Sequence, residues 1–340
     1  MNTDWGKIKG VVDEAMRERL LPGCVVGVVE KERNGFCTKI VPFGRFTYEK
    51  NAPAVSEKSI YDVASLTKVL PVSTLALMLL EKGSISLDDR IGTFLPKLKG
   101  PYRDAVTVEH LLTQTLEFSY TFSSLQNLSP KEIFEKIYLL ELARPPGTAC
   151  VFSNATSVLL GLVIEQVSGR PLDVLARHLL FDPLGLTRTT FFPERFPIEE
   201  VVPTEESGEG GGSALQGVGE GARSVSLRVV HDETTRRLKT EANMIVGSAG
   251  LFSTGEDMLK FVGAVLGNEI ERLGPCTGSG WQVDNGRLFK TGFTGCLMML
   301  DLNREKGLVV LSNAVHPKRH ENYIKNRNGF FRKISDVVFD

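Results

Sequence analysis

Residues 61–68 read Tyr-Asp-Val-Ala-Ser-Leu-Thr-Lys and begin an apolar helical pattern that continues to residue 82. Positions i and i+3 of a helix share one face, so we expect the Lys68 amine beside the Ser65 hydroxyl, near the positive end of the helix dipole. A serine becomes nucleophilic when a base takes its proton, and a lysine serves when burial and neighbouring cations keep it neutral. The spacing therefore indicates a nucleophilic serine with a lysine base.

This pair is weak evidence by itself, because a serine and a lysine at this spacing occur by chance about once in a chain of ordinary composition. The alternative is a helix-capping serine beside a solvated lysine. Two downstream elements change the balance. Phe152-Ser153-Asn154 leads into a helical pattern at 154–168, and Lys290-Thr291-Gly292 lies on a late strand-like run and is followed by Phe293.

The apolar patterns also predict the fold. Strands at 24–29 and 37–43 flank an Asn-Gly hairpin signal, and four strand-like runs follow at 279–283, 287–291, 296–301 and 307–312. Helical patterns lie at 4–20, 65–82, 107–114, 129–142, 154–168 and 171–180, and from about 322. Strands at both ends with helices between them predict an α/β (α+β) fold, in which terminal helices flank one antiparallel sheet and an all-helical lobe is inserted.

The predicted division of the chain follows from these patterns. Residues 1–60 and 230–340 form the sheet lobe, and residues 61–203 form the helical lobe that carries Ser65 and Lys68. Residues 204–228 are rich in glycine, which cannot bury enough apolar surface to order itself, so we expect a mobile loop there.

The composition restricts the class of partner. The chain has 340 residues, of which 42% are hydrophobic, and its 40 basic and 41 acidic residues nearly cancel. No overall field favours nucleic acid or an anionic membrane, so we expect a small-molecule or peptide substrate.

The location and the absence of a cofactor are further expectations. We see neither an 18-residue apolar run nor a secretory leader, which predicts a cytoplasmic protein without a membrane span. Five cysteines without C-x-x-C spacing suit reduced thiols better than disulfides or zinc, and no metal or other cofactor is expected. His231-Asp232-Glu233 favours a structural hydrogen-bonding role over a metal site.

The three elements, in this order, resemble the serine β-lactamases, the penicillin-binding D,D-peptidases and related esterases, nearest to the branch of class C β-lactamases and β-lactamase-like esterases. Supporting segments at 61–68, 109–113, 230–233, 249–254 and 312–317 extend the resemblance over most of the chain. It implies a β-lactamase/transpeptidase-like fold.

The resemblance also implies roles for individual residues. Ser65 is acylated by an ester, amide or lactam carbonyl, with Lys68 as proton acceptor or as a cation that tunes its partners. Asn154 orients Lys68 and the substrate. Lys290 and Thr291 meet a substrate carboxylate or hydroxyl. The backbone amides of Ser65 and Phe293 form the oxyanion hole, and Gly292 and Phe152 complete the substrate site.

One departure from the family pattern leaves two hypotheses open. The family has Tyr-x-Asn at the second element, whereas Phe152 keeps the ring and lacks the hydroxyl that relays protons. The first hypothesis is a serine hydrolase, similar to an esterase, a β-lactamase or a D,D-peptidase. The second is a degenerate homologue that binds a ligand, or is slowly acylated by it, without efficient turnover. A scaffold that uses the fold alone is the third and least favoured reading.

Overall fold

The computed structural model describes residues 3–33, 35–205, 232–267 and 280–340. Residues 206–228 of the predicted glycine-rich loop lie outside the described residues, as does His231.

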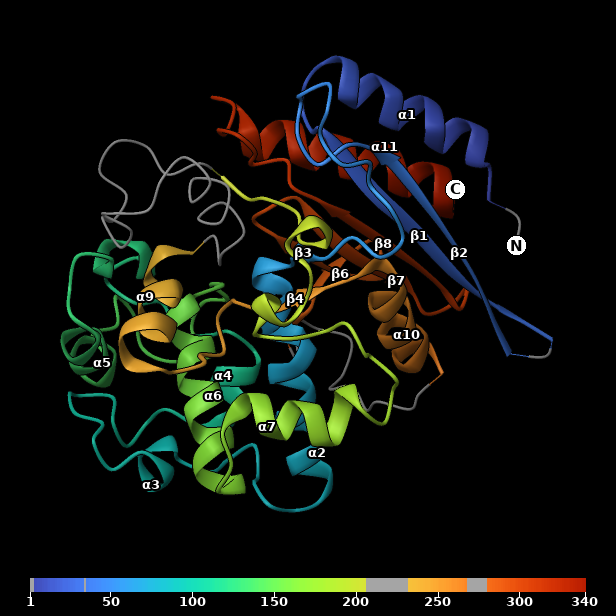
Figure 1. Ribbon diagram of the computed structural model, residues 1–340. Coiled ribbons are helices and arrows are strands. Elements are labelled where there is room, and N and C mark those ends of the chain that lie inside the picture. The colour runs from blue at the N-terminus through green and yellow to red at the C-terminus, as the bar shows by residue number, and fades with distance from the viewer. Residues whose placement is uncertain (1–2, 34, 206–231, 268–279) are drawn as a thin grey trace.

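An antiparallel six-stranded sheet contains both ends of the chain (Figure 1). Its strands are β1 (Gly23–Glu32), β2 (Gly35–Gly44), β5 (Gln282–Asp284), β6 (Arg287–Gly292), β7 (Cys296–Asp301) and β8 (Lys306–Ser312). They lie in the order β2-β1-β8-β7-β6-β5, so the first strand pairs directly with the last, as Val26 does with Val310. This arrangement confirms the predicted antiparallel sheet built from both termini.

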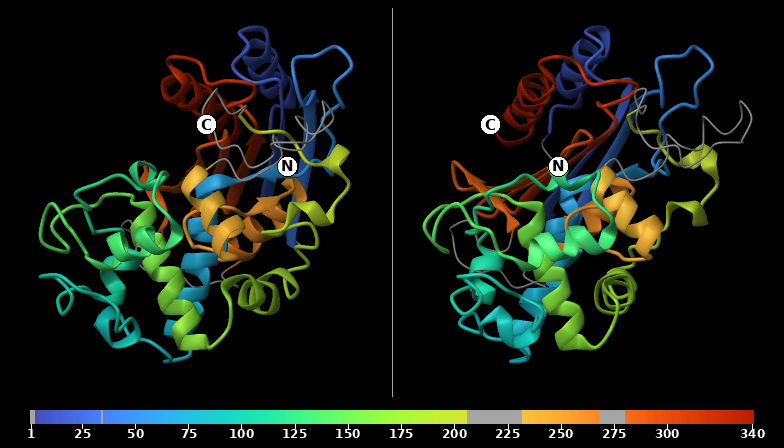
Figure 2. Two further views of the ribbon diagram at one scale, coloured as in Figure 1. Left: turned by 60° about the vertical axis from the view of Figure 1, so that its left-hand side comes forward. Right: turned by 90° about the vertical axis from the view of Figure 1, so that its left-hand side faces the viewer.

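Both faces of the sheet are covered, which explains why its central strands are almost continuously apolar. On one face, Val26 and Val310 pack with the terminal helices α1 (Trp5–Arg17) and α11 (Tyr323–Phe339). Those two helices lie side by side in Figure 2, and Lys333 of α11 pairs with Glu14 of α1 at 2.9 Å. On the other face, Val25 packs with α10 (Gly255–Leu266) in the larger core.

The other α-helices within the described residues form the second half of the molecule (Figure 1). They are α2 (Thr74–Glu81), α3 (Ile91–Phe94), α4 (Val108–Leu112), α5 (Pro130–Tyr138), α6 (Asn154–Ser168), α7 (Leu172–Ala176) and α9 (Glu233–Ala242). They share one apolar core with the inner face of the sheet, so the two halves are joined by packing. The fold class is confirmed, whereas the exact domain boundaries stay a prediction.

The helical pattern that begins near Ser65 is interrupted, which differs from the expected continuous helix at 65–82. A 3₁₀ helix covers Ala64–Lys68, and the π-helical segment Val69–Ser73, which contains the non-helical Leu70, separates it from α2. The following residue, Pro71, accounts for the break, because proline disfavours the α conformation of the residue before it. The stretch Ala64–Glu81 has the length and apolar character of a membrane span, contrary to the expectation from sequence, but 78% of it is buried inside the fold, as in a core helix.

Candidate active site

The backbone around Ser65 is fixed from two sides. Strand β3 (Tyr61–Asp62) pairs with β4 (Phe252–Ser253) and leads directly into the 3₁₀ helix. Ala64 has a φ of 48°, which side-chain-bearing residues rarely adopt, and the Asp62 carboxylate accepts a hydrogen bond from the Ala64 amide at 2.8 Å. Backbone strain of this kind persists where the surrounding structure enforces it, and it often marks functional sites. Ser65 itself remains partly exposed.

Lys68 lies beside the Ser65 hydroxyl, as the spacing predicts. Its Nζ is 3.0 Å from Ser65 Oγ and donates to the backbone carbonyl of Ser248 at 2.6 Å. The 3₁₀ geometry favours this contact, because residues three apart are eclipsed along such a helix. Lys68 is only 3% exposed. Burial lowers the pKa of Lys68 from 10.5 to about 8, against the opposing effect of the Asp232 carboxylate.

Asn154 is placed differently from the expectation. It is the first residue of α6, and its side-chain amide donates to Asp232 Oδ2 at 3.4 Å, while the hydrogen-bond partners of Lys68 are Ser65 and Ser248. Asp232 also caps α9 by accepting from the Thr235 amide at 2.7 Å. Asn154 is therefore linked to Lys68 through Asp232, whose carboxylate accepts a hydrogen bond from Asn154 and acts on Lys68 by its charge.

Lys290 brings a second amine into the site from strand β6. It is 3% exposed, and its Nζ lies 3.9 Å from the centroid of the Phe152 ring. Burial, reinforced by the nearby charge of Lys68, holds the pKa of Lys290 well below its usual value. The aromatic face of Phe152 offers the amine a cation–π contact in place of a hydroxyl partner.

The residues after Lys290 lie against the Ser65 segment. Thr291 is partly buried, and Gly292 is so close to the backbone carbonyl of Val63 that a Cβ atom there would lie 2.5 Å from it. Phe293 turns its ring away, toward Tyr323 of α11, with 5.5 Å between ring centroids. Any contact of Phe293 with a substrate is therefore through its backbone.

Asp232 and Ser248 act on Lys68 without having been singled out as site residues. A signal for Asp232 was available, because an aspartate directly before a helical segment is an N-cap pattern. No sequence signal pointed to the contact of Ser248 with Lys68, because that contact is made by its backbone carbonyl, which every residue has. Its hydroxyl lies 3.0 Å from Thr235 Oγ1, so the first turn of α9 contacts both Asn154 and Ser248.

A serine–lysine pair on a 3₁₀ turn, placed between an antiparallel sheet and a helical lobe, is typical of serine hydrolases that form acyl-enzymes. The profile of the Beta-lactamase family matches residues 8–328. The chain therefore belongs to the Beta-lactamase family and is a serine hydrolase.

Individual relatives agree with this assignment. Esterase EstB of Burkholderia gladioli is 27% identical over 290 residues, which cover 77% of this chain and 70% of the relative. Among solved structures, EstCE1, a hydrolase with promiscuous acyltransferase activity, matches with a TM-score of 0.72 at 21% identity, covering 98% of both chains. D-amino acid amidase from Ochrobactrum anthropi SV3 has the same TM-score and coverage at 20% identity.

Proposed function

We propose that this chain hydrolyses a small ester, amide or lactam through an acyl-enzyme on Ser65. The observation that carries the proposal is the 3.0 Å contact between the buried Lys68 Nζ and the Oγ of the partly exposed Ser65. A lysine with a pKa of about 8 is neutral in an appreciable fraction of molecules near neutral pH, and only the neutral amine accepts a proton.

The acylation step uses this pair. Lys68 takes the proton of Ser65 as Oγ bonds to the substrate carbonyl carbon, and the backbone amides of Ser65 and Phe293 stabilise the oxyanion. The ammonium of Lys68 then returns the proton to the leaving alcohol or amine as its bond to carbon breaks. Water repeats the sequence on the acyl-enzyme and releases the acid.

The substrate contacts follow from the second amine. Lys290 offers its amine to a substrate carboxylate or hydroxyl, and Thr291 and Asn154 donate further hydrogen bonds, with Phe152 and Gly292 lining the same site. EstB is named as an esterase and the Ochrobactrum protein as an amidase, which supports ester and amide substrates for this chain as well.

Phe152 supports a second candidate function, a protein that is acylated but releases the acyl group slowly. The Lys290 amine lies over the ring of Phe152. Phe152 stands where the family has a tyrosine, so the ring is kept and the tyrosine hydroxyl is missing. Hydrolysis of an acyl-enzyme needs a base near the attacking water, so loss of that hydroxyl affects deacylation more than acylation.

Stopped-flow measurement with p-nitrophenyl acetate separates the two candidates and tests both. A burst of one equivalent followed by sustained turnover is expected for the hydrolase, and a burst without turnover for the trapped acyl-enzyme. Ser65→Ala should abolish both phases, whereas Ser84→Ala, which changes an exposed serine, should leave them intact. Equal kinetics in Ser65→Ala and the wild type would overturn the proposal.

The proposed cytoplasmic location is supported by the cysteines. Cys24, Cys37, Cys150 and Cys296, the cysteines within the described residues, are all free thiols. Free thiols suit a reducing compartment.

A further inference from the structure

The turn that follows Lys290 on strand β6 is held from behind by helix α11. The Gly292 carbonyl accepts from the Gly295 amide at 3.3 Å, which closes the turn, and from Arg327 Nη1 at 3.1 Å. One residue further on, the Tyr323 hydroxyl donates to the Phe293 carbonyl. Tyr323 and Arg327 are four residues apart on α11, so both face the turn.

The same turn is attached to the Ser65 segment on its other side. Gly292 lies against the Val63 carbonyl, and the Thr294 hydroxyl donates to the Asp62 carbonyl at 2.7 Å. A movement of the turn relative to Ser65 would therefore break contacts with both Asp62 and α11.

The Arg327 guanidinium is oriented before it reaches the turn. Its Nε and Nη2 donate to Oδ1 of Asn328 at 3.2 and 2.9 Å, which leaves Nη1 directed at Gly292. The guanidinium carbon also lies 5.8 Å from the centroid of the Tyr323 ring and 5.7 Å from that of Phe331.

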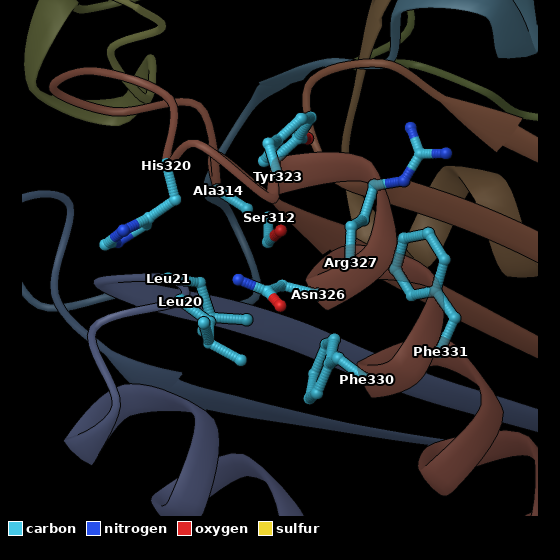
Figure 3. A pocket seen from close by; sticks show the side chains of 10 residues that line it. All are labelled: Leu20, Leu21, Ser312, Ala314, His320, Tyr323, Asn326, Arg327, Phe330 and Phe331. Carbon is cyan, nitrogen blue, oxygen red and sulfur yellow. The ribbon is translucent and has the colours of Figure 1, made fainter.

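A neighbouring recess offers no rival explanation for Arg327. In Figure 3 the Arg327 side chain extends beside the Tyr323 and Phe331 rings, and its guanidinium points away from the recess that Asn326 enters. That recess has a volume of about 10 Å³, room for about one water molecule. It is too small to bind a substrate.

The chemistry follows from the peptide group that Arg327 contacts. The Gly292 carbonyl and the Phe293 N–H belong to one planar trans peptide, so they point in opposite directions. A cationic donor on the oxygen fixes the plane of this peptide and draws electron density from its nitrogen, which strengthens the N–H as a donor.

We propose that Arg327 is a positioning residue, whose guanidinium orients and polarises the Gly292–Phe293 peptide so that the Phe293 amide stabilises the oxyanion. This inference rests on the proposed function, in which the Phe293 amide forms part of the oxyanion hole. Arg327 acts through the peptide, and it does not touch the substrate.

The test compares Arg327→Met and Arg327→Lys with Arg332→Met, which removes an exposed arginine from the same helix. Each variant is assayed on a p-nitrophenyl ester and on the matching thionoester, whose sulfur accepts hydrogen bonds poorly. Loss of a whole oxyanion donor costs about 10²–10³ in kcat, so a weakened donor should cost less. We expect Arg327→Met to lower ester acylation about 10- to 100-fold with little change in KM, and to leave thionoester acylation almost unchanged.

The controls keep the outcomes distinct. Arg327→Lys, which keeps the charge but loses the fork to Asn328, should retain part of the rate, and Arg332→Met all of it. Wild-type ester kinetics in Arg327→Met would overturn the inference, as would equal losses on both substrates together with a lower melting temperature. Failure of the proposed function itself would instead be seen as turnover in Ser65→Ala.

Discussion

The pH dependence of acylation should follow the titration of Lys68. With a pKa of about 8, roughly one tenth of the protein carries a neutral Lys68 at pH 7, against about one in 3,000 for a lysine at 10.5. Burial therefore raises the reactive fraction about 300-fold at that pH. Because the neutral amine is the base, the acylation rate should rise with pH and reach a plateau above pH 8.

Asp232→Asn provides the perturbation. The Asp232 carboxylate opposes the lowering of the pKa of Lys68, so removing its charge should lower that pKa further. The rising limb of the pH profile should then move to lower pH. Asparagine also caps helices, so the hydrogen bond from the Thr235 amide can be kept. Lys290, whose pKa is lowered in part by the charge of Lys68, is unchanged by the substitution.

Single-turnover stopped-flow kinetics with a p-nitrophenyl ester between pH 5 and 10 measure this limb, with the Ser65→Ala rate subtracted as background. The wild-type midpoint should lie near 8 and that of Asp232→Asn below it. A wild-type midpoint near 10.5, or a limb that moves to higher pH in Asp232→Asn, would refute the electrostatic reasoning.

Three further predictions concern single side chains. Lys68→Met should slow acylation strongly, because it removes the base. The variant should nevertheless unfold at higher urea concentration at pH 7, because keeping the buried lysine charged costs the folded state about 3 kcal/mol, partly offset by the Ser248 carbonyl that loses its partner. The folded-state pKa is the lower one, so wild-type stability should rise between pH 8 and 10.5 and the advantage of Lys68→Met should shrink; a constant difference would contradict this. Lys290→Ala should raise KM about 10- to 100-fold for a carboxylate-bearing lactam and less for a neutral ester, and equal effects would exclude a carboxylate-binding role. Phe152→Tyr should speed deacylation in burst experiments, whereas unchanged kinetics with a lower melting temperature would indicate an unsatisfied phenol.

Local sequence patterns predicted the parts of the structure that depend on local geometry. The three-residue spacing was enough to place Lys68 beside Ser65, and the apolar strands at the two ends were enough to predict a shared sheet. The break at Leu70 was missed, although Pro71 is visible in the sequence and restricts the residue before it.

Local sequence patterns could not predict the contacts between segments that are distant in the sequence. Ser248 lies 180 positions from Lys68 and binds it through a carbonyl, an atom that every residue has. The partner of Asn154 depends on how α9 packs against α6, and the link from Arg327 to Gly292 depends on how α11 packs behind β6. The positive φ of Ala64 had no sequence signal either, because alanine does not favour that conformation.

The identity of the nucleophile is tested most directly by exposing the purified protein to a fluorophosphonate and locating the adduct by peptide mass spectrometry. The reagent bonds to an activated serine oxygen and releases fluoride. We expect one adduct, on the peptide that contains Ser65, absent from Ser65→Ala and strongly slowed in Lys68→Met. An adduct confined to another residue, or no adduct in a protein whose Ser65→Ala variant still hydrolyses esters at the wild-type rate, would contradict the assignment of Ser65 as the nucleophile.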